Sequence, residues 1–292
     1  MNFKIFFLSF FLFFNLTVLS QNSYEYFGVL KLNGNSKTVI TYRLIFKEFN
    51  NQISGYSITD LGGNHETKNI ISGNYDKKSR ILNFKETDIL YTKSTFDENA
   101  FCFVNFSNKI ELSSLQNKLE GNFEGLYKNK KKCINGTLSL VGSEKINKLI
   151  NKLNNKIQKS KKLDVKSKDK FNTVKMLDSL KMNNLTANQN LNIFWESNDI
   201  NLEVWDNGKI DDDKINIYVN NKLLLSNYSV VSNKKLITVK IIEKNVIKIE
   251  AINEGSISPN TARILLSDNN RTFELTSNLK KLETSSITFL KK

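Results

Sequence analysis

Short runs of alternating apolar and polar residues, separated by Gly, Asn or Asp, fill most of this 292-residue chain. Alternation with a period of two is typical of half-buried β-strands. Runs this close together leave no length for helical crossovers, so neighbouring strands should pair antiparallel. Such runs occur throughout residues 21–143, among them 80–85, 89–93 and 109–115, and nine of them occur in residues 185–292. The pattern predicts a mainly β protein with two β units.

The N-terminal unit carries a recurring apolar-x-Gly motif, seen for example at Ile53 to Gly55 and at Ile71 to Gly73. Glycine weakens a flat strand but allows a sheet to coil sharply. We therefore expect residues 21–143 to form an antiparallel meander or barrel-like domain of about eight to ten strands. Its many phenylalanines fit a barrel filled by its own side chains, and they equally fit a lipocalin-like barrel that carries a small ligand.

The C-terminal unit, residues 185–292, has short runs at regular spacing. Asn220 and Asn221 stand between two of them, which is a signal for a tight hairpin. This spacing favours a β-sandwich of the immunoglobulin-like or jelly-roll kind. The cysteine pair of immunoglobulin domains is absent from this unit.

Between the units, the apolar spacing changes to that of a helix. The apolar stripe consists of Ile146, Leu149, Ile150, Leu153 and Ile157. Residues 171–180 suggest a second, shorter helix. Residues 144–181 hold 12 Lys and 4 acidic residues, so most of the net charge of +14 lies here. We interpret residues 144–184 as a Lys-rich helical linker.

The basic face of the first predicted helix has two interpretations. It carries Lys145, Lys148, Lys152 and Lys156. It is either a solvated face whose opposite stripe packs onto a neighbouring domain, or a face attracted to an anionic surface such as lipid headgroups or acidic polysaccharide. The segment uses Lys without Arg and the two β units are nearly neutral, so nucleic acid is not an expected partner.

The first twenty residues have the pattern of a secretory signal peptide, with Lys4 before an apolar run and cleavage expected before Gln21. The run is too short for a membrane span, so the mature chain should have no transmembrane segment. The two cysteines, Cys102 and Cys133, should form a disulfide in an exported protein, with two buried thiols as the alternative. We expect a periplasmic or extracellular location.

An acidic loop follows Trp205 in the C-terminal unit. We selected Asp206, Asp211 and Asp213 as candidate calcium ligands, because hard cations prefer oxygen ligands and Gly208 allows the loop to turn. The spacing does not match an EF-hand, and an acidic solvated turn is the alternative. The loop 253–260 would supply further oxygen atoms if it lies at the same end of the sandwich.

The single histidine, His65, lies in a Gly-containing loop near Asp60 and several hydroxyl side chains. A hydrolytic triad needs a nucleophile and an acid within reach of the imidazole, and no nucleophile motif accompanies this residue. We therefore interpret His65 as a turn residue and name no catalytic residue.

Two stretches resemble secreted two-domain β proteins of Bacteroidota that have no established activity. They are the run Gly55 to Lys68, and Trp205-Asp-Asn-Gly together with the run Asn253 to Ala262. Those proteins tend to have Asp-Gly-Asp where this chain has Asp211, Asp212 and Asp213. The resemblance implies an exported bacterial protein and adds no mechanism.

Together these features predict a non-catalytic secreted or periplasmic protein that binds or scaffolds components of the bacterial cell envelope. One alternative is a calcium-dependent glycan-binding module that uses the loop from Asp206 to Asp213. Another is a lipocalin-like small-ligand carrier in the N-terminal domain. Partners consistent with the sequence are an envelope protein, a glycan or an anionic surface.

Overall fold

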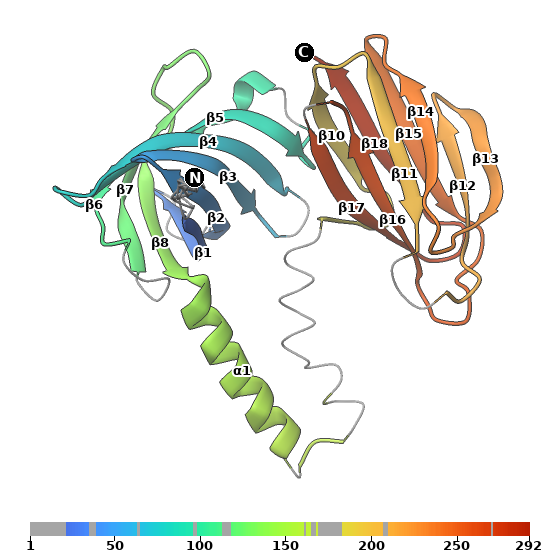
Figure 1. Cartoon of the computed structure of the whole chain (residues 1–292), viewed down its shortest axis with the longest axis horizontal. Coiled ribbons are helices and arrows are strands. Elements are labelled where there is room, and N and C mark those ends of the chain that lie inside the picture. The colour runs from blue at the N-terminus through green and yellow to red at the C-terminus, as the bar shows by residue number, and fades with distance from the viewer. Residues whose placement is uncertain are drawn as a thin grey trace, which may run out of the picture.

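The structure is a computed structural model. It describes residues 22–34, 39–62, 65–95, 98–112, 118–160, 162–164, 168, 183–206, 210–269 and 271–292. The predicted signal peptide (1–20) and the predicted second linker helix (171–180) lie outside the described residues. Strands dominate both halves of the chain, as the alternation predicted (Figure 1).

The N-terminal half contains eight strands and one short 3-10 helix. They are β1 (Asn22–Leu32), β2 (Val39–Phe49), β3 (Gln52–Asp60), β4 (Thr67–Asp76), β5 (Ile81–Thr92), η1 (Glu98–Ala100), β6 (Phe103–Lys109), β7 (Lys118–Leu126) and β8 (Gly136–Gly142). Each strand pairs antiparallel with the next, and β1 also pairs with β8. The sheet thus closes into an eight-stranded antiparallel barrel, which confirms the predicted barrel-like domain.

Two details of the predicted meander are wrong. The runs expected at 80–85 and 89–93 form one long strand, β5, whose pairing with β4 shifts register between Ile70 and Ile71. The run expected at 109–115 is not a strand over residues 110–112, and its remainder lies outside the described residues. In β5 a bulge-like irregularity lets one strand bend where the sequence suggested a break.

Strand glycines allow the barrel to curl. Gly73 in β4 lies opposite Phe84 in β5, and Gly55 in β3 lies opposite Phe46 in β2. A Cβ atom on Gly73 would lie 2.0 Å from the carbonyl oxygen of Asn83 and 2.8 Å from the Cα of Phe84. The backbones therefore approach so closely that only glycine fits, as the recurring motif suggested.

The C-terminal half contains ten strands. They are β9 (Asn183–Leu185), β10 (Asn190–Trp195), β11 (Asp199–Trp205), β12 (Lys214–Val219), β13 (Lys222–Ser229), β14 (Lys235–Lys240), β15 (Lys244–Ala251), β16 (Asn260–Ser267), β17 (Thr272–Leu279) and β18 (Thr284–Lys291). Nine of them match predicted runs, and only the three-residue β9 was missed. Asn220 and Asn221 connect β12 to β13 with φ values of 50° and 66°, as expected for the predicted tight hairpin.

These strands form two sheets that bury one common core, which confirms the predicted sandwich. One sheet has the order β13-β12-β15-β18-β10 and the other the order β14-β11-β16-β17-β9. The pairs β10–β18 and β9–β17 are parallel, whereas the other pairs within the two sheets are antiparallel. Side chains from both sheets, such as Ile217, Leu202 and Ile264, belong to a single hydrophobic cluster.

The barrel and the sandwich are hydrogen-bonded to each other, which the sequence did not predict. β5 pairs with β10 through Thr92 and Tyr91, so the barrel strands and one sheet of the sandwich form a continuous 13-stranded sheet (Figure 1). The ring of Tyr91 also packs edge-on against Phe273, 4.8 Å between centroids. Lys93 Nζ donates a 2.8 Å hydrogen bond to the carbonyl oxygen of Asn184.

One helix, α1 (Ser143–Lys159), follows β8 and projects away from the barrel (Figure 1). It confirms the predicted helical start of the linker. Its principal contacts with strands are to β1 and β8, next to its first turn. Leu149 and Leu153 of the apolar stripe are 56% and 49% exposed. The other stripe residues, Ile146, Ile150 and Ile157, are half-buried. Both interpretations of the helix therefore stay predictions.

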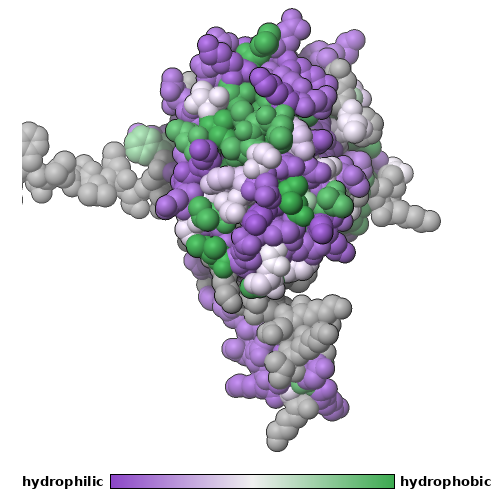
Figure 2. Space-filling model, turned by 90° about the vertical axis from the view of Figure 1, so that its right-hand side faces the viewer, coloured by the Kyte–Doolittle hydropathy of each residue, from purple (hydrophilic) through white to green (hydrophobic). Residues whose placement is uncertain are grey.

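Part of the sandwich surface is apolar. Figure 2 looks onto the side of the molecule that the sandwich forms and shows hydrophobic side chains gathered on it. Leu223 and Leu224 of β13 and Leu236 of β14 are exposed, and both strands are edges of their sheets. Within the described residues, no helix is long and apolar enough to span a membrane.

Candidate binding pocket at the open end of the barrel

The barrel interior is packed at one end and hollow at the other. Leu44, Phe46, Leu82 and Phe84 belong to a buried cluster that fills the packed end. At the other end lies a cavity of about 220 Å³, where the chain connects β1 to β2, β3 to β4, β5 to β6 and β7 to β8. The barrel is therefore filled by its own side chains at one end, and the carriage of a ligand at the other end stays a prediction.

The wall of this cavity is mainly apolar. Its apolar lining comprises Leu30, Leu32, Ile40, Leu61, Phe101, Phe103, Val104, Phe123 and Ile134. Leu30 and Leu32 of β1 both point into the cavity, because residues two apart along a strand share a face of the sheet. A largely apolar cavity with a few convergent polar groups is the usual form of a small-molecule site.

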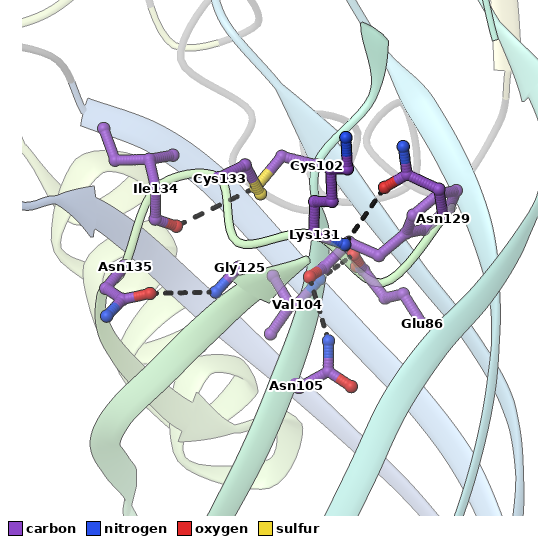
Figure 3. The surroundings of a disulfide bond; sticks show 11 residues. Glu86, Cys102, Val104, Asn105, Gly125, Asn129, Lys131, Cys133, Ile134 and Asn135 are labelled. Carbon is purple, nitrogen blue, oxygen red and sulfur yellow. Dashed lines mark hydrogen bonds between the residues drawn. A yellow bond between two sulfur atoms is a disulfide. The ribbon is translucent and has the colours of Figure 1, made fainter. Parts of the chain in front are cut away.

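A carboxylate lies inside this wall. Glu86 is 5% exposed, and its Oε1 accepts a 2.9 Å hydrogen bond from the hydroxyl of Tyr42 and another from the hydroxyl of Ser57. Its Oε2 accepts a 2.7 Å hydrogen bond from the backbone N–H of Val104 (Figure 3). Burial raises the pKa of Glu86, and these hydrogen bonds oppose that rise.

Next to Glu86 is a buried amide with an unused acceptor. The side chain of Asn69 is hydrogen-bonded to Glu86, and the residue is 5% exposed. Its Oδ1 atom accepts no hydrogen bond from any residue that the structure describes. Leaving a buried acceptor unpaired costs roughly 1–3 kcal/mol. This oxygen has less than 1 Å² of accessible surface, so the wall encloses it and it does not face the cavity space.

The rim of the cavity holds the single histidine. His65 Nδ1 lies 3.2 Å from Ser94 Oγ, and Asp60 Oδ1 accepts a 3.2 Å hydrogen bond from the backbone N–H of His65. In a hydrolytic triad the acid binds the imidazole ring, whereas here it binds the backbone. The arrangement therefore fixes the loop at the rim, in keeping with a turn residue.

A disulfide braces the same end of the barrel. Cys102 and Cys133 are bonded, with their Cα atoms 6.1 Å apart, as the sequence predicted. The bond ties the β5–β6 connection to the β7–β8 connection beside Gly125, and Cys102 itself lines the cavity (Figure 3). A Cβ atom on Gly125 would lie 2.5 Å from the Cys102 sulfur, so this strand passes directly under the disulfide.

The two acidic-loop segments of the sandwich meet as the sequence hypothesis required. Asp211 Oδ2 accepts a 2.8 Å hydrogen bond from the N–H of Ile257, and Asp213 Oδ2 accepts one of 2.8 Å from the N–H of Thr261. Asp213 is 1% exposed, and its pKa is raised to about 6, mainly by burial. Charge repulsion from the nearby Asp211 and Asp206 contributes to this rise.

These carboxylates do not converge as a metal site would. Among the described residues, no three His, Cys, Asp or Glu side chains gather closely enough to hold a metal ion. Residues 207–209 lie outside the described residues. Calcium binding by Asp206, Asp211 and Asp213 therefore stays a prediction. The lysines Lys145, Lys148, Lys152 and Lys156 are exposed along α1, and their proposed anionic partner also stays a prediction.

The sequence reasoning missed Glu86 and Asn69. A signal for Glu86 was present, because it follows the inward residues Leu82 and Phe84 at a spacing of two. Asn69 likewise alternates with Thr67 and Ile71 on the inner face of β4. An ionisable residue in phase with core positions is a reason to expect a site inside the barrel.

Comparisons with known proteins matched no family model, no curated protein and no solved structure. The function is therefore argued from the geometry of the pocket.

Proposed function

We propose that this protein binds a small organic ligand in the open end of its barrel. The observation that carries the proposal is a mainly apolar cavity whose wall also contains the buried polar side chains of Asn69 and Glu86. A cavity that serves only packing has no need of such groups, and a small ligand with a polar group would use them.

The volume limits the size of the ligand. A cavity of about 220 Å³ holds roughly seven water molecules at ~30 Å³ each. A ligand with a single ring or a short chain therefore fits inside it. The disulfide and the closed sheet hold the wall in place before binding, which limits the entropy lost when the ligand is ordered.

The proposal keeps the protein among exported binding proteins. A structural disulfide persists in oxidising compartments such as the periplasm, and the predicted signal peptide agrees with that location. The binding role needs no catalytic group, and the rim residues His65, Ser94 and Asp60 do not have the geometry of a triad.

A screen of single-ring and short-chain compounds by thermal shift and ligand-observed NMR tests the proposal. We expect binders in the wild-type protein that are lost in Leu32→Trp, which fills the cavity from its wall. Tyr127→Trp adds the same ring at an exposed position outside the pocket and should bind as the wild type does. The proposal fails if no compound binds, or if Leu32→Trp binds as well as Tyr127→Trp.

A calcium-dependent glycan-binding sandwich is the second candidate. One observation favours it: Asp213 Oδ1 is buried without a hydrogen-bond partner among the described residues, where the two predicted loops meet. A cation is one way to satisfy such an oxygen. The calcium titration in the Discussion tests this candidate.

A further inference from the structure

The charge of the pocket is opposite to that of the protein. The chain carries 43 Lys and Arg against 29 acidic residues. The residues that line the cavity, all of them described, include the carboxylates of Glu86 and Asp60 and contain no Lys or Arg. His65 at the rim is the only other titratable group of the lining. A cavity that excludes the commonest charged side chains of the chain has a local field that favours cations.

Glu86 has no cationic partner in the protein as described. Its hydrogen-bond donors are the hydroxyls of Tyr42 and Ser57, the N–H of Val104 and the amide of Asn69, all of which are neutral. Buried carboxylates are usually paired with a cation, because neutral donors only partly replace the lost hydration. The other buried carboxylate of the barrel, Glu48, follows that rule, since Lys77 Nζ lies 3.1 Å from its Oε1.

The cavity brings a ligand to this carboxylate. Glu86 and Asn69 both line it, together with the apolar side chains of its wall. A ligand with a charged N–H donor gains more there than one with a neutral donor, because a hydrogen bond to an ionised group is about twice as strong as one between neutral groups.

We infer that the ligand of this pocket is a small organic ammonium, with its charge balancing Glu86 and its apolar part against the cavity wall. This inference rests on the proposed function and names its ligand class. The same field repels carboxylates, so short fatty acids and aromatic acids are excluded as ligands.

Matched triplets test the ligand class. Each triplet keeps one apolar framework and changes only the polar group, as in benzylamine, benzyl alcohol and benzoate. Isothermal titration with wild-type protein at neutral pH should give an amine affinity at least about tenfold above that of the alcohol, which corresponds to about 1.4 kcal/mol. The carboxylate should show no binding.

Two glutamine variants locate the charge. Glu86→Gln should reduce the preference for the amine over the alcohol to within about twofold while the alcohol still binds, since only the charge term is removed. Glu48→Gln makes the same change at a buried position that does not line the cavity, so its preference should match that of the wild type. Circular dichroism and melting curves check that both variants fold.

The outcomes distinguish a failure of the ammonium inference from a failure of the proposed function. If alcohols or carboxylates bind as well as amines, the ammonium inference is wrong and the pocket remains a binding site. If no member of any triplet binds, the proposed function fails as well. If Glu86→Gln does not fold, the order of the amine, alcohol and carboxylate affinities in the wild-type protein tests the inference. If Glu86→Gln folds and keeps the wild-type preference for the amine, the inference is wrong.

Discussion

The hydroxyl of Tyr42 donates a 2.9 Å hydrogen bond to the carboxylate of Glu86 in the interior of the barrel. This contact joins β2 to β5, which are not neighbours in the sheet, across the barrel interior. It stabilises the ionised carboxylate, and so it counteracts the rise in the pKa of Glu86 that burial causes. Both the fold and the charge of the pocket depend on it.

Tyr42→Phe should lower the free energy of unfolding by about 1.5–3 kcal/mol at neutral pH, since a hydrogen bond to a charged group is lost. Because burial raises the pKa of Glu86 above its ordinary value of 4.5, the folded state holds the proton more tightly than the unfolded state. Stability therefore falls as the pH rises from 4.5 through the raised pKa, and this loss should extend to higher pH in the variant. Urea unfolding across pH measures it.

Tyr75→Phe is the control for that measurement. The hydroxyl of Tyr75 donates to the carbonyl oxygen of Ile110, which does not titrate. Its loss should cost about 1 kcal/mol at every pH. Equal pH dependence in the two variants would contradict the role given to Tyr42.

Removal of the disulfide should destabilise the barrel by roughly 3–4 kcal/mol in the chain-entropy model, because Cys102 and Cys133 are 31 residues apart. Guanidinium unfolding with and without a reductant measures this difference. The double variant Cys102→Ser and Cys133→Ser should unfold at the midpoint of the reduced wild type and show no effect of reductant. A midpoint that does not move on reduction would show that the bond does not constrain the unfolded chain.

Gly73→Ala should destabilise the barrel by about 1–3 kcal/mol or more, because the added methyl group meets the backbone of β5 at Asn83 and Phe84. Gly34→Ala adds the same methyl group with nothing within 4 Å and costs only the strain of its φ of +79°, about 1 kcal/mol. Thermal unfolding of both variants compares them. A smaller loss for Gly73→Ala than for Gly34→Ala would refute the close approach of the strands.

Asp213→Asn should raise the stability of the sandwich at neutral pH and abolish part of its pH dependence. The pKa of Asp213 is raised from 3.8 to about 6, so the folded state favours the protonated carboxyl group. Its unfavourable contribution therefore grows as the pH rises from 3.8 to about 6 and is complete above that range. The asparagine oxygen can still accept from Thr261 N–H. Asp212→Asn, at an exposed position, should change stability little.

The calcium hypothesis gives a different result with the same variant. If the acidic loop binds calcium, the melting temperature of the wild type rises on addition of calcium chloride and returns on addition of EDTA, and Asp213→Asn loses the response. Magnesium chloride at equal ionic strength controls for salt. The hypothesis is wrong if neither calcium nor EDTA changes the melting temperature of the wild type.

The sequence predicted most of the strands because alternation is local and each strand of the barrel has one buried face. It also predicted the helical start of the linker, the disulfide and the Asn220-Asn221 hairpin. The prediction failed where one local pattern is compatible with two different structures. The interruption within β5 resembled a turn and is a shift of register, and β9 is too short to show a pattern.

Alternation states which side chains share a face of a strand, and by itself it determined the β class of this protein and its two stretches of strands. Helical spacing and the lysine count predicted the basic linker between them. Alternation does not state which strands pair across long separations, so the closure of β1 on β8 and the pairing of β5 with β10 were decided by the tertiary structure. Whether the barrel is filled depends on the sum of side-chain volumes from eight strands, which no single segment contains. For the same reason only the folded barrel brings Tyr42, Asn69 and Glu86 together beside a cavity.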